Sequence, residues 1–202
     1  RRLAREELMD DIAAVSWPVA KQIFGIARPR VLDPEEPELY VLLDFTSNWQ
    51  DDLEHKDRLA RRVLTEYPSH QAPLNVADLV TLVPEFRVFS ELPTRLTFLI
   101  DNPGGGLTWV GSYGPTSSWL AGYEAARLVM ERAGFPPAVV LRPMRTAHFG
   151  VLRMITTFNS SDAAEVAAVR RMNEAICDAI VPLGFVPYKT PPWVVRRFEN
   201  SI

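Results

Sequence analysis

Cysteine is scarce in this sequence, since Cys177 is the only one among 202 residues. A single cysteine excludes an internal disulfide and any metal site built from several cysteines. The three histidines show no His-x-x-x-His spacing and no cluster with acidic residues, so no metal site is expected. Without a disulfide framework to indicate an oxidising compartment, we expect a cytoplasmic protein.

Long apolar segments and an excess of positive charge are also missing. The longest apolar runs, such as AVVL and YVLLDF, are far too short to cross a bilayer. The 22 basic and 25 acidic residues give a net charge of −3, which predicts no basic surface for nucleic acid. We therefore expect neither a membrane nor a nucleic-acid partner. Hydrophobic residues make up 47% of the chain, which is ordinary for a globular protein with a buried core.

Nucleotide-binding motifs are absent as well. The glycine-rich stretch GGGLTWVGSYGPTSSW (104–119) runs into an apolar strand, whereas a dinucleotide fingerprint lies between a strand and a helix. A P-loop requires Gly-Lys-Ser/Thr, and no lysine is near these glycines. We interpret them as a flexible entry into a strand whose backbone passes close to another strand or to a flat ligand.

The second half of the chain alternates between strand and helix patterns. Strands are predicted at 107–114, 138–144 and 149–158, and a last short one at FVPYK. The order is β-α-β-β-α-β, that of a split βαβ or ferredoxin-like unit. The predicted fold class is α+β, an antiparallel sheet of ferredoxin-like units with helices on one face. The unit at 107–190 is the clearer one.

Two helices are predicted between these strands. Thr116 caps the first and Gly134 ends it. Residues 160–162 cap the second, and Gly184 ends it. Each helix has an apolar face at spacings of three and four residues, which predicts packing against the sheet. The two faces consist of Trp119, Tyr123, Ala126 and Met130, and of Val166, Val169, Met172, Ile176 and Ile180.

The first half is less regular. Apolar residues at helical spacing predict a helix over 4–24. LYVLLDF (39–45) predicts a buried strand, and 49–66 predicts a helix capped by Ser47 or Asn48. That strand and helix look like part of a second ferredoxin-like unit. Beyond them, only a short helix around NVADLVTLV and a strand at FRVFSEL are predicted.

Polar side chains gather near the hairpin of the second half. His148 lies between two strands that carry Arg142 and Arg153. Because these strands are expected to pair, the two arginines share one face and either bind an anion or form a solvated surface. For His148, a catalytic role and ordinary hairpin hydrogen bonds are equal alternatives.

The last strand ends with Tyr188 and Lys189, just before two prolines. A phenol beside an ammonium is suited to gripping or deprotonating a phenolic or carboxylate substrate. The alternative is a surface pair on an edge strand. Along the first strand of this half, Trp109 and Tyr113 alternate with Val110, and we expect Val110 to face the helices.

Three stretches, GGGLTWVGSYGPTSSW, GFPPAVVLRPMRTAHFGVLRMITTFNSSDAAEV and GFVPYKTPPW, resemble the C-terminal half of FAD-linked oxidases. The branch is that of vanillyl-alcohol oxidase and 4-cresol dehydrogenase. The resemblance covers 1–202 in order and implies the cap or substrate domain, which roofs the isoalloxazine ring while a separate domain holds most of the FAD. It implies hydride transfer from a small alcohol or hydroxy acid, aromatic or not, to flavin.

The resemblance also assigns roles to residues. The Tyr-Arg pair that grips a phenolate in this family corresponds to Tyr188 and Lys189, and a lysine keeps the charge but loses the planar fork. With His148, they are the predicted catalytic residues. Arg142 and Arg153 are the predicted substrate-binding residues.

Cofactor contacts are expected from Trp109, Ser112 and Tyr113. The family's covalent flavin tether would fall near 108–110, where no residue can form it, so FAD is expected to bind non-covalently. Its phosphate-binding domain is missing from this chain and would come in cis or from a partner chain. A homodimer is one candidate assembly. The alternative function is a non-enzymatic ferredoxin-like module for ligand binding or dimerisation.

Overall fold

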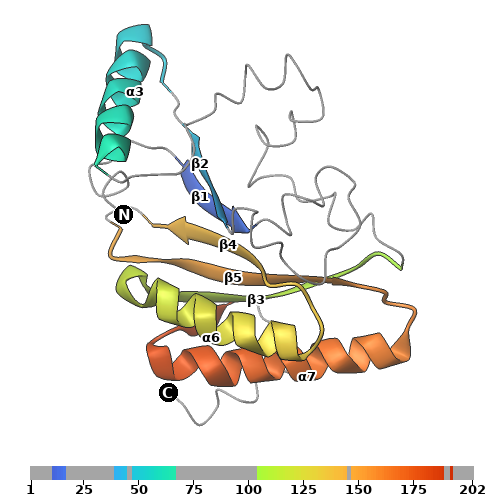
Figure 1. The fold of residues 1–202 in the computed structure, drawn as a ribbon. Coiled ribbons are helices and arrows are strands. Elements are labelled where there is room, and N and C mark those ends of the chain that lie inside the picture. Colours follow the sequence, from blue (N-terminus) through green and yellow to red (C-terminus); the bar gives the residue numbers. More distant parts are fainter. Residues whose placement is uncertain are drawn as a thin grey trace.

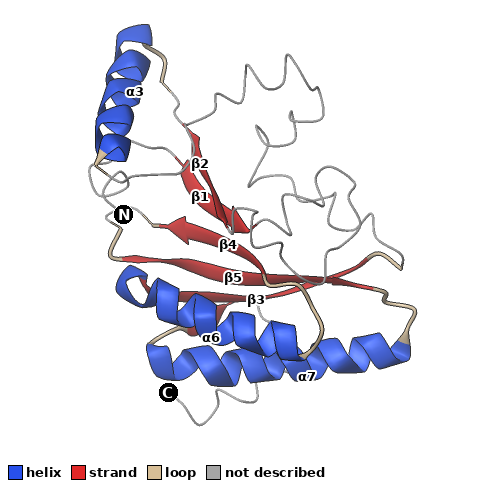
Figure 2. Ribbon diagram, in the orientation of Figure 1, coloured by secondary structure: helices blue, strands red, loops and turns tan. Residues whose placement is uncertain are grey.

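A computed structural model describes residues 11–16, 39–44, 47–66, 104–144, 147–188 and Pro192, with backbone alone for the first two ranges. Within these residues, six strands form one antiparallel sheet, and helices cover one of its faces (Figures 1 and 2). The fold class is therefore α+β with an antiparallel sheet, as predicted. The helix and strand predicted at NVADLVTLV and FRVFSEL lie outside the described residues.

The strands are β1 (Asp11–Ser16), β2 (Leu39–Asp44), β3 (Gly106–Pro115), β4 (Ala138–Pro143), β5 (Phe149–Phe158) and β6 (Val186–Tyr188). The helices are α3 (Gln50–Thr65), α6 (Trp119–Arg132) and α7 (Ala163–Ile180), with 3-10 turns η3 (Thr116–Ser118) and η4 (Val181–Leu183). The sheet order is β2-β1-β4-β5-β3-β6. Strands β4 and β5 are neighbours joined directly, whereas α6 connects β3 to β4 across β5, and α7 connects β5 to β6 across β3.

Helices α6 and α7 lie side by side beneath β3 and β5 and bury one core with them (Figure 1). The predicted faces account for this packing. Tyr123, Ala126 and Met130 of α6 meet Met172 and Ile176 of α7 in the core cluster. Gly134 follows α6 with φ of 78°, the left-handed conformation that ends a helix at low cost. Helix α7 ends at Ile180, four residues before the predicted end, and Gly184, with φ of 88°, ends the turn η4 that follows it.

Phe185 locks this layer together. Its ring is 1% exposed and lies against two glycines, Gly114 of β3 and Gly122 of α6. A Cβ atom at Gly122 would lie 2.5 Å from Phe185 Cε2, and one at Gly114 would lie 2.4 Å from Cδ1. The absence of side chains at both positions therefore lets one aromatic ring join a strand to a helix.

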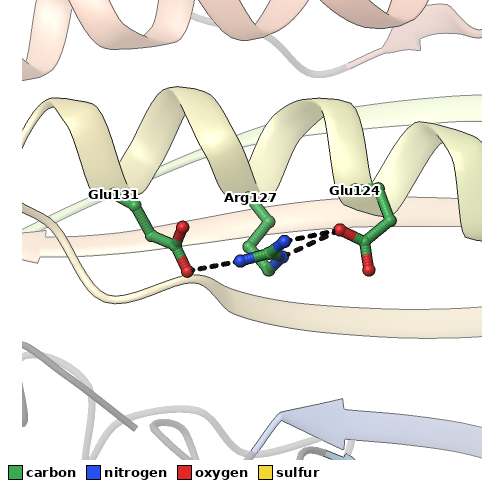
Figure 3. A network of polar contacts seen from close by, with 3 residues as sticks. All are labelled: Glu124, Arg127 and Glu131. Carbon is green, nitrogen blue, oxygen red and sulfur yellow. Dashed lines mark hydrogen bonds and ion pairs between the residues drawn. The ribbon is translucent and has the colours of Figure 1, made fainter.

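The surface of α6 carries a small ionic network (Figure 3). Arg127 donates to Glu124, at 2.7 Å from Nη2, and to Glu131, at 2.8 Å from Nη1. Both hydrogen bonds raise the pKa of Arg127 above its ordinary value, and the one to Glu124 has the larger effect. Pairs three and four residues apart stabilise a helix by about 0.2–0.5 kcal/mol each, so this network supports α6 locally.

The predicted helix over 4–24 is wrong at Asp11–Ser16, which forms strand β1. The six-residue segment DIAAVS pairs along its whole length with β2 and also meets β4, where Val15 opposes Val140. Ladder hydrogen bonds on both sides outweigh the weak helical preference of a short apolar segment. Strand β2 matches the strand predicted at 39–45.

Two predicted helix caps are also corrected. Trp49 is the N-cap of α3. Ser47 lies two residues earlier, and its Oγ accepts a hydrogen bond from the Trp49 N–H at 3.1 Å. Thr116 begins η3 rather than capping α6, and its hydroxyl donates to the carbonyl of Ala147 at 2.6 Å. Asp162 caps α7 as predicted, because its carboxylate accepts from the first-turn amides. Among the described helices, none has the length and apolar character needed to span a bilayer.

Replacing Gly122 with alanine tests the Phe185 contact. Alanine favours a helix over glycine by about 1 kcal/mol. The added methyl group would nevertheless press on a buried ring that has no room to move, and overpacking costs about 1–3 kcal/mol. We expect Gly122→Ala to lower the free energy of unfolding by up to about 2 kcal/mol in urea denaturation.

A Phe185→Leu background provides the control. The shorter side chain removes the ring edge nearest Gly122, so the cost of Gly122→Ala should shrink in the double variant. Additive costs in the two backgrounds would contradict this packing.

Candidate functional site

The two faces of β3 have different surroundings. Val110 is fully buried in the core shared with α6 and α7. Successive strand residues point to opposite sides, so Trp109, Gly111 and Tyr113 lie on the face away from these helices. The orientation predicted for Val110 is confirmed. We call the face that carries Trp109, Gly111 and Tyr113 of β3, with Arg153 of β5, the distal face.

Three residues from three strands form one row across the distal face. Gly111 of β3 pairs with Arg153 of β5 on one side and with Tyr188 of β6 on the other. Across the glycine, Arg153 Nη2 donates to Tyr188 Oη at 2.8 Å. A Cβ atom at Gly111 would lie only 3.3 Å from Tyr188 Cε1. Gly111 therefore leaves the space in which a guanidinium and a phenol meet.

Stacked rings adjoin this row. The Tyr188 ring stacks on Tyr113, with centroids 4.2 Å apart and an angle of 19° between the planes. Tyr113 stacks in turn on Phe149, with centroids 5.5 Å apart. Such pairs add about 0.5–1.5 kcal/mol each beyond the area they bury. The stack fixes the direction of the Tyr188 phenol and joins β5, β3 and β6 through aromatic contacts.

Trp109 adjoins the row on its other side. The guanidinium carbon of Arg153 lies 5.7 Å from the centroid of the indole ring, within the range of a cation–π contact. The indole Nε1 and the Arg153 Nε are both buried without a hydrogen-bond partner. The resulting distal-face cluster consists of Trp109, Gly111, Tyr113, Phe149, Arg153 and Tyr188.

Not every predicted site residue joins this cluster. Ser112 lies on the helix side of β3, fully buried, and its Oγ donates to the carbonyl of Leu152 at 3.1 Å. The structure thus separates Ser112 from Trp109 and Tyr113, the other residues predicted to contact a cofactor. Lys189 lies outside the described residues.

The predicted site residues His148 and Arg142 lie outside the distal-face cluster. His148 is exposed and lies five residues before Arg153, about 17 Å along an extended strand. Among the described side chains, none bridges His148 to Tyr188 by a hydrogen bond. Arg142 shares the distal face with Arg153, as predicted, because Arg142 pairs with Val151 and Arg153 with Val140. It is exposed and diagonal to the cluster.

Sequence reasoning paired Tyr188 with Lys189, whereas the structure pairs it with Arg153. The two residues are 35 positions apart, and no local spacing connects them. The signal that could have found the pair is Gly111, a glycine inside a strand, which often marks a close approach of neighbouring groups. Once the strand order β5-β3-β6 is known, Gly111 is the residue that lies between Arg153 and Tyr188.

Comparison with known proteins places the fold. No protein-family model and no curated protein sequence matches the chain. Among solved structures, p-cresol methylhydroxylase with substrate bound matches with a TM-score of 0.73 and 11% identity, over 100% of this chain and 42% of that chain. The 4-ethylphenol oxidase of Gulosibacter chungangensis, in complex with isoeugenol, matches with a TM-score of 0.71 and 12% identity, over 94% of this chain and 42% of that one.

Both neighbours are FAD-linked oxidases of the vanillyl-alcohol oxidase type. This chain shares its fold with them. The similarity inferred from the sequence is therefore confirmed for the fold, although identity is only 11–12%. The chain spans about two-fifths of the length of each neighbour, 42% in both cases.

The described residues offer an FAD molecule aromatic and hydrogen-bonding contacts through the distal-face cluster. The sequence offers no dinucleotide fingerprint for a pyrophosphate. The chemistry of the cluster thus suits an aromatic, oxygen-bearing group, and not the phosphates of the cofactor.

Replacing Tyr113 with alanine tests the ring stack. Only the Tyr113–Tyr188 pair joins β3 to β6, so its loss removes about 0.5–1.5 kcal/mol from the attachment of the short strand β6. We expect the amides of Val186 and Tyr188 to exchange with deuterium about two- to ten-fold faster, measured by hydrogen exchange under native conditions. Tyr113→Phe keeps both ring contacts and should exchange like the parent protein. Equal acceleration in the two variants would mean that stacking does not hold β6.

Proposed function

We propose that this chain is the substrate-binding cap domain of an FAD-dependent oxidoreductase. In this proposal the enzyme takes a hydride from a small aromatic alcohol or hydroxy acid. The observation that carries the proposal is the whole-chain similarity to p-cresol methylhydroxylase and 4-ethylphenol oxidase, whose names specify para-alkyl phenols. The aromatic and hydrogen-bonding character of the distal-face cluster is consistent with such substrates.

The flavin-binding domain would lie outside this chain. More than half of each neighbour has no counterpart here, and this chain has no phosphate-binding fingerprint. We infer a cis FAD-binding domain, or one on a partner chain. We also assign the β3-α6-β4-β5-α7-β6 segment, with its sheet order β4-β5-β3-β6, to the ferredoxin-like class. The match extends over the whole chain, which favours an oxidase over an unrelated ferredoxin-like module.

The chain's own residues would bind and orient the substrate. The oxygen of Tyr188 accepts a hydrogen bond from Arg153, so the phenol hydrogen stays available to donate to a substrate oxygen. The ring stack restricts the phenol to one direction. FAD, when bound, supplies the two-electron acceptor for the hydride that leaves the substrate carbon. The apolar side chains of Trp109 and Tyr113 would exclude water beside that carbon.

The 202-residue chain alone should purify without flavin. It has no phosphate-binding turn, and the ring contacts of the distal face are too few to hold FAD without the rest of the cofactor site. We expect a colourless chain, and a full-length protein that absorbs near 450 nm (approximately, as flavins do). Stoichiometric flavin in the isolated chain would contradict the proposal that another domain is needed to hold FAD.

Tyr188→Phe tests the role of the phenol. In the full-length enzyme it removes one hydrogen bond to the substrate and leaves the ring stack in place. A hydrogen bond that involves a charged group contributes about 1.5–3 kcal/mol. We expect kcat/KM to fall by about ten- to a hundred-fold with flavin content unchanged, measured by steady-state kinetics.

The matched control is Tyr123→Phe, which changes a tyrosine buried among α6 and α7 instead of one on the distal face. It should leave kcat/KM close to that of the parent enzyme. If Tyr188→Phe also leaves kcat/KM unchanged, the phenol has no part in substrate binding.

A further inference from the structure

The segment just before β5 has a backbone conformation that its side chain disfavours. Ala147 has φ of 55°, and no other non-glycine residue in the described part of the chain has a positive φ. In this left-handed conformation Cβ crowds the following carbonyl oxygen, so it persists only where surrounding contacts impose it. Ala147 is also fully buried. The fold therefore holds Ala147 in place against its own preference.

Thr116 supplies contacts that impose this conformation. It directly follows β3 and is buried. Its Oγ1 donates to the carbonyl of Ala147 at 2.6 Å, and its N–H donates to the carbonyl of His148 at 3.1 Å. The Ala147 N–H donates to the carbonyl of Met144, and the Met144 N–H donates to that of Phe149, both at 2.9 Å. These four hydrogen bonds fix the backbone that leads into β5.

Phe149 begins β5 and is the outer ring of the aromatic stack. Its centroid lies 5.5 Å from that of Tyr113, which lies 4.2 Å from that of Tyr188. Phe149 is 45% exposed, so its surroundings constrain the ring less than those of a buried side chain would. The position of its ring therefore depends on its backbone. A shift of that backbone would reach Tyr188 through Tyr113.

We propose that Thr116 and Ala147 are positioning residues for substrate binding, because they hold Phe149 against Tyr113 and the stack then directs the hydroxyl of Tyr188. The inference rests on the proposed function, in which that hydroxyl donates to the substrate. It adds two residues that lie outside the distal-face cluster. Backbone strain that the surroundings impose is typical of sites that need a fixed geometry. A phenol already held in one direction loses less conformational entropy when a substrate binds.

Thr116→Val tests the contact, because valine keeps the shape of threonine and loses the hydroxyl that donates to Ala147. In the full-length enzyme we expect KM to rise by about three- to ten-fold with kcat nearly unchanged, since a substrate-binding group is misplaced. In a Tyr188→Phe background the same change should alter KM by less than about two-fold, because no hydroxyl is left to direct. Thr116→Ser keeps the donor and should keep the parental KM.

A signal from Tyr188 itself provides a readout that does not depend on activity. The full-length protein is labelled with 13C at the tyrosine Cζ, and the Tyr188 signal is identified by its loss in Tyr188→Phe. We expect Thr116→Val to shift or broaden this signal and Thr116→Ser to leave it in place. Phe149→Leu interrupts the stack one step later, so it should act like Thr116→Val and replaces that variant if valine prevents folding.

Two controls separate positioning from a general loss of stability. Thr65→Val removes a hydrogen bond of the same kind, from Oγ1 to the carbonyl of Arg62 at 2.6 Å, on α3 and outside the distal-face cluster. Val169→Ala opens a cavity in the core on the α7 side of the sheet. Both should leave KM and the Tyr188 signal at their parental values. Changes in these controls as large as those in Thr116→Val would contradict the positioning role.

The outcome is separable from that of the proposed function. If the enzyme oxidises aromatic alcohols and neither KM nor the Tyr188 signal responds to Thr116→Val, the positioning role is overturned and the oxidoreductase proposal stands. An equal rise of KM with and without the Tyr188 hydroxyl would also overturn the positioning role. If the Tyr188 signal responds in a full-length protein that binds no flavin, the contact directs the phenol as inferred and the oxidoreductase proposal is wrong.

Discussion

The hydrogen bond from Arg153 to Tyr188 across Gly111 is the contact on which the candidate site depends. It joins three strands in one row, and it exists because the middle strand contributes no side chain there. A larger residue at Gly111 would press on the phenol ring and separate the two groups. The phenol is then directed by its stack on Tyr113, and the guanidinium by its contact with Trp109.

The two faces of the sheet carry different kinds of side chain. On one side, Phe185 and the apolar faces of α6 and α7 form a closed core that also buries Ser112. On the other side lie an arginine, aromatic rings and two buried donors without acceptors. Burying unpaired donors is unfavourable by about 1–3 kcal/mol each. This division explains why alternate residues of β3 have such different surroundings.

The parts of the fold that local sequence determines were predictable. The end of α6 at Gly134, the Asp162 cap of α7 and the apolar faces of both helices depend on residues within a few positions of one another. Strand β1 was misassigned as helix, because DIAAVS is short and only its pairing with β2 and β4 decides its conformation. The site was predictable only in part. Trp109, Tyr113, Arg153 and Tyr188 were singled out one by one. The contact between Arg153 and Tyr188 was not predicted, because it depends on strand register, which local patterns do not encode.

The central claim is that the distal face is the one turned toward the reaction centre. A crystal structure of the full-length protein with bound flavin and an aromatic substrate analogue tests it most directly. The account predicts the isoalloxazine ring and the analogue on the distal face, with an oxygen of the analogue within hydrogen-bonding distance of the Tyr188 hydroxyl. A flavin or an analogue bound instead against the α6–α7 layer, with Tyr188 contacting neither, would contradict it.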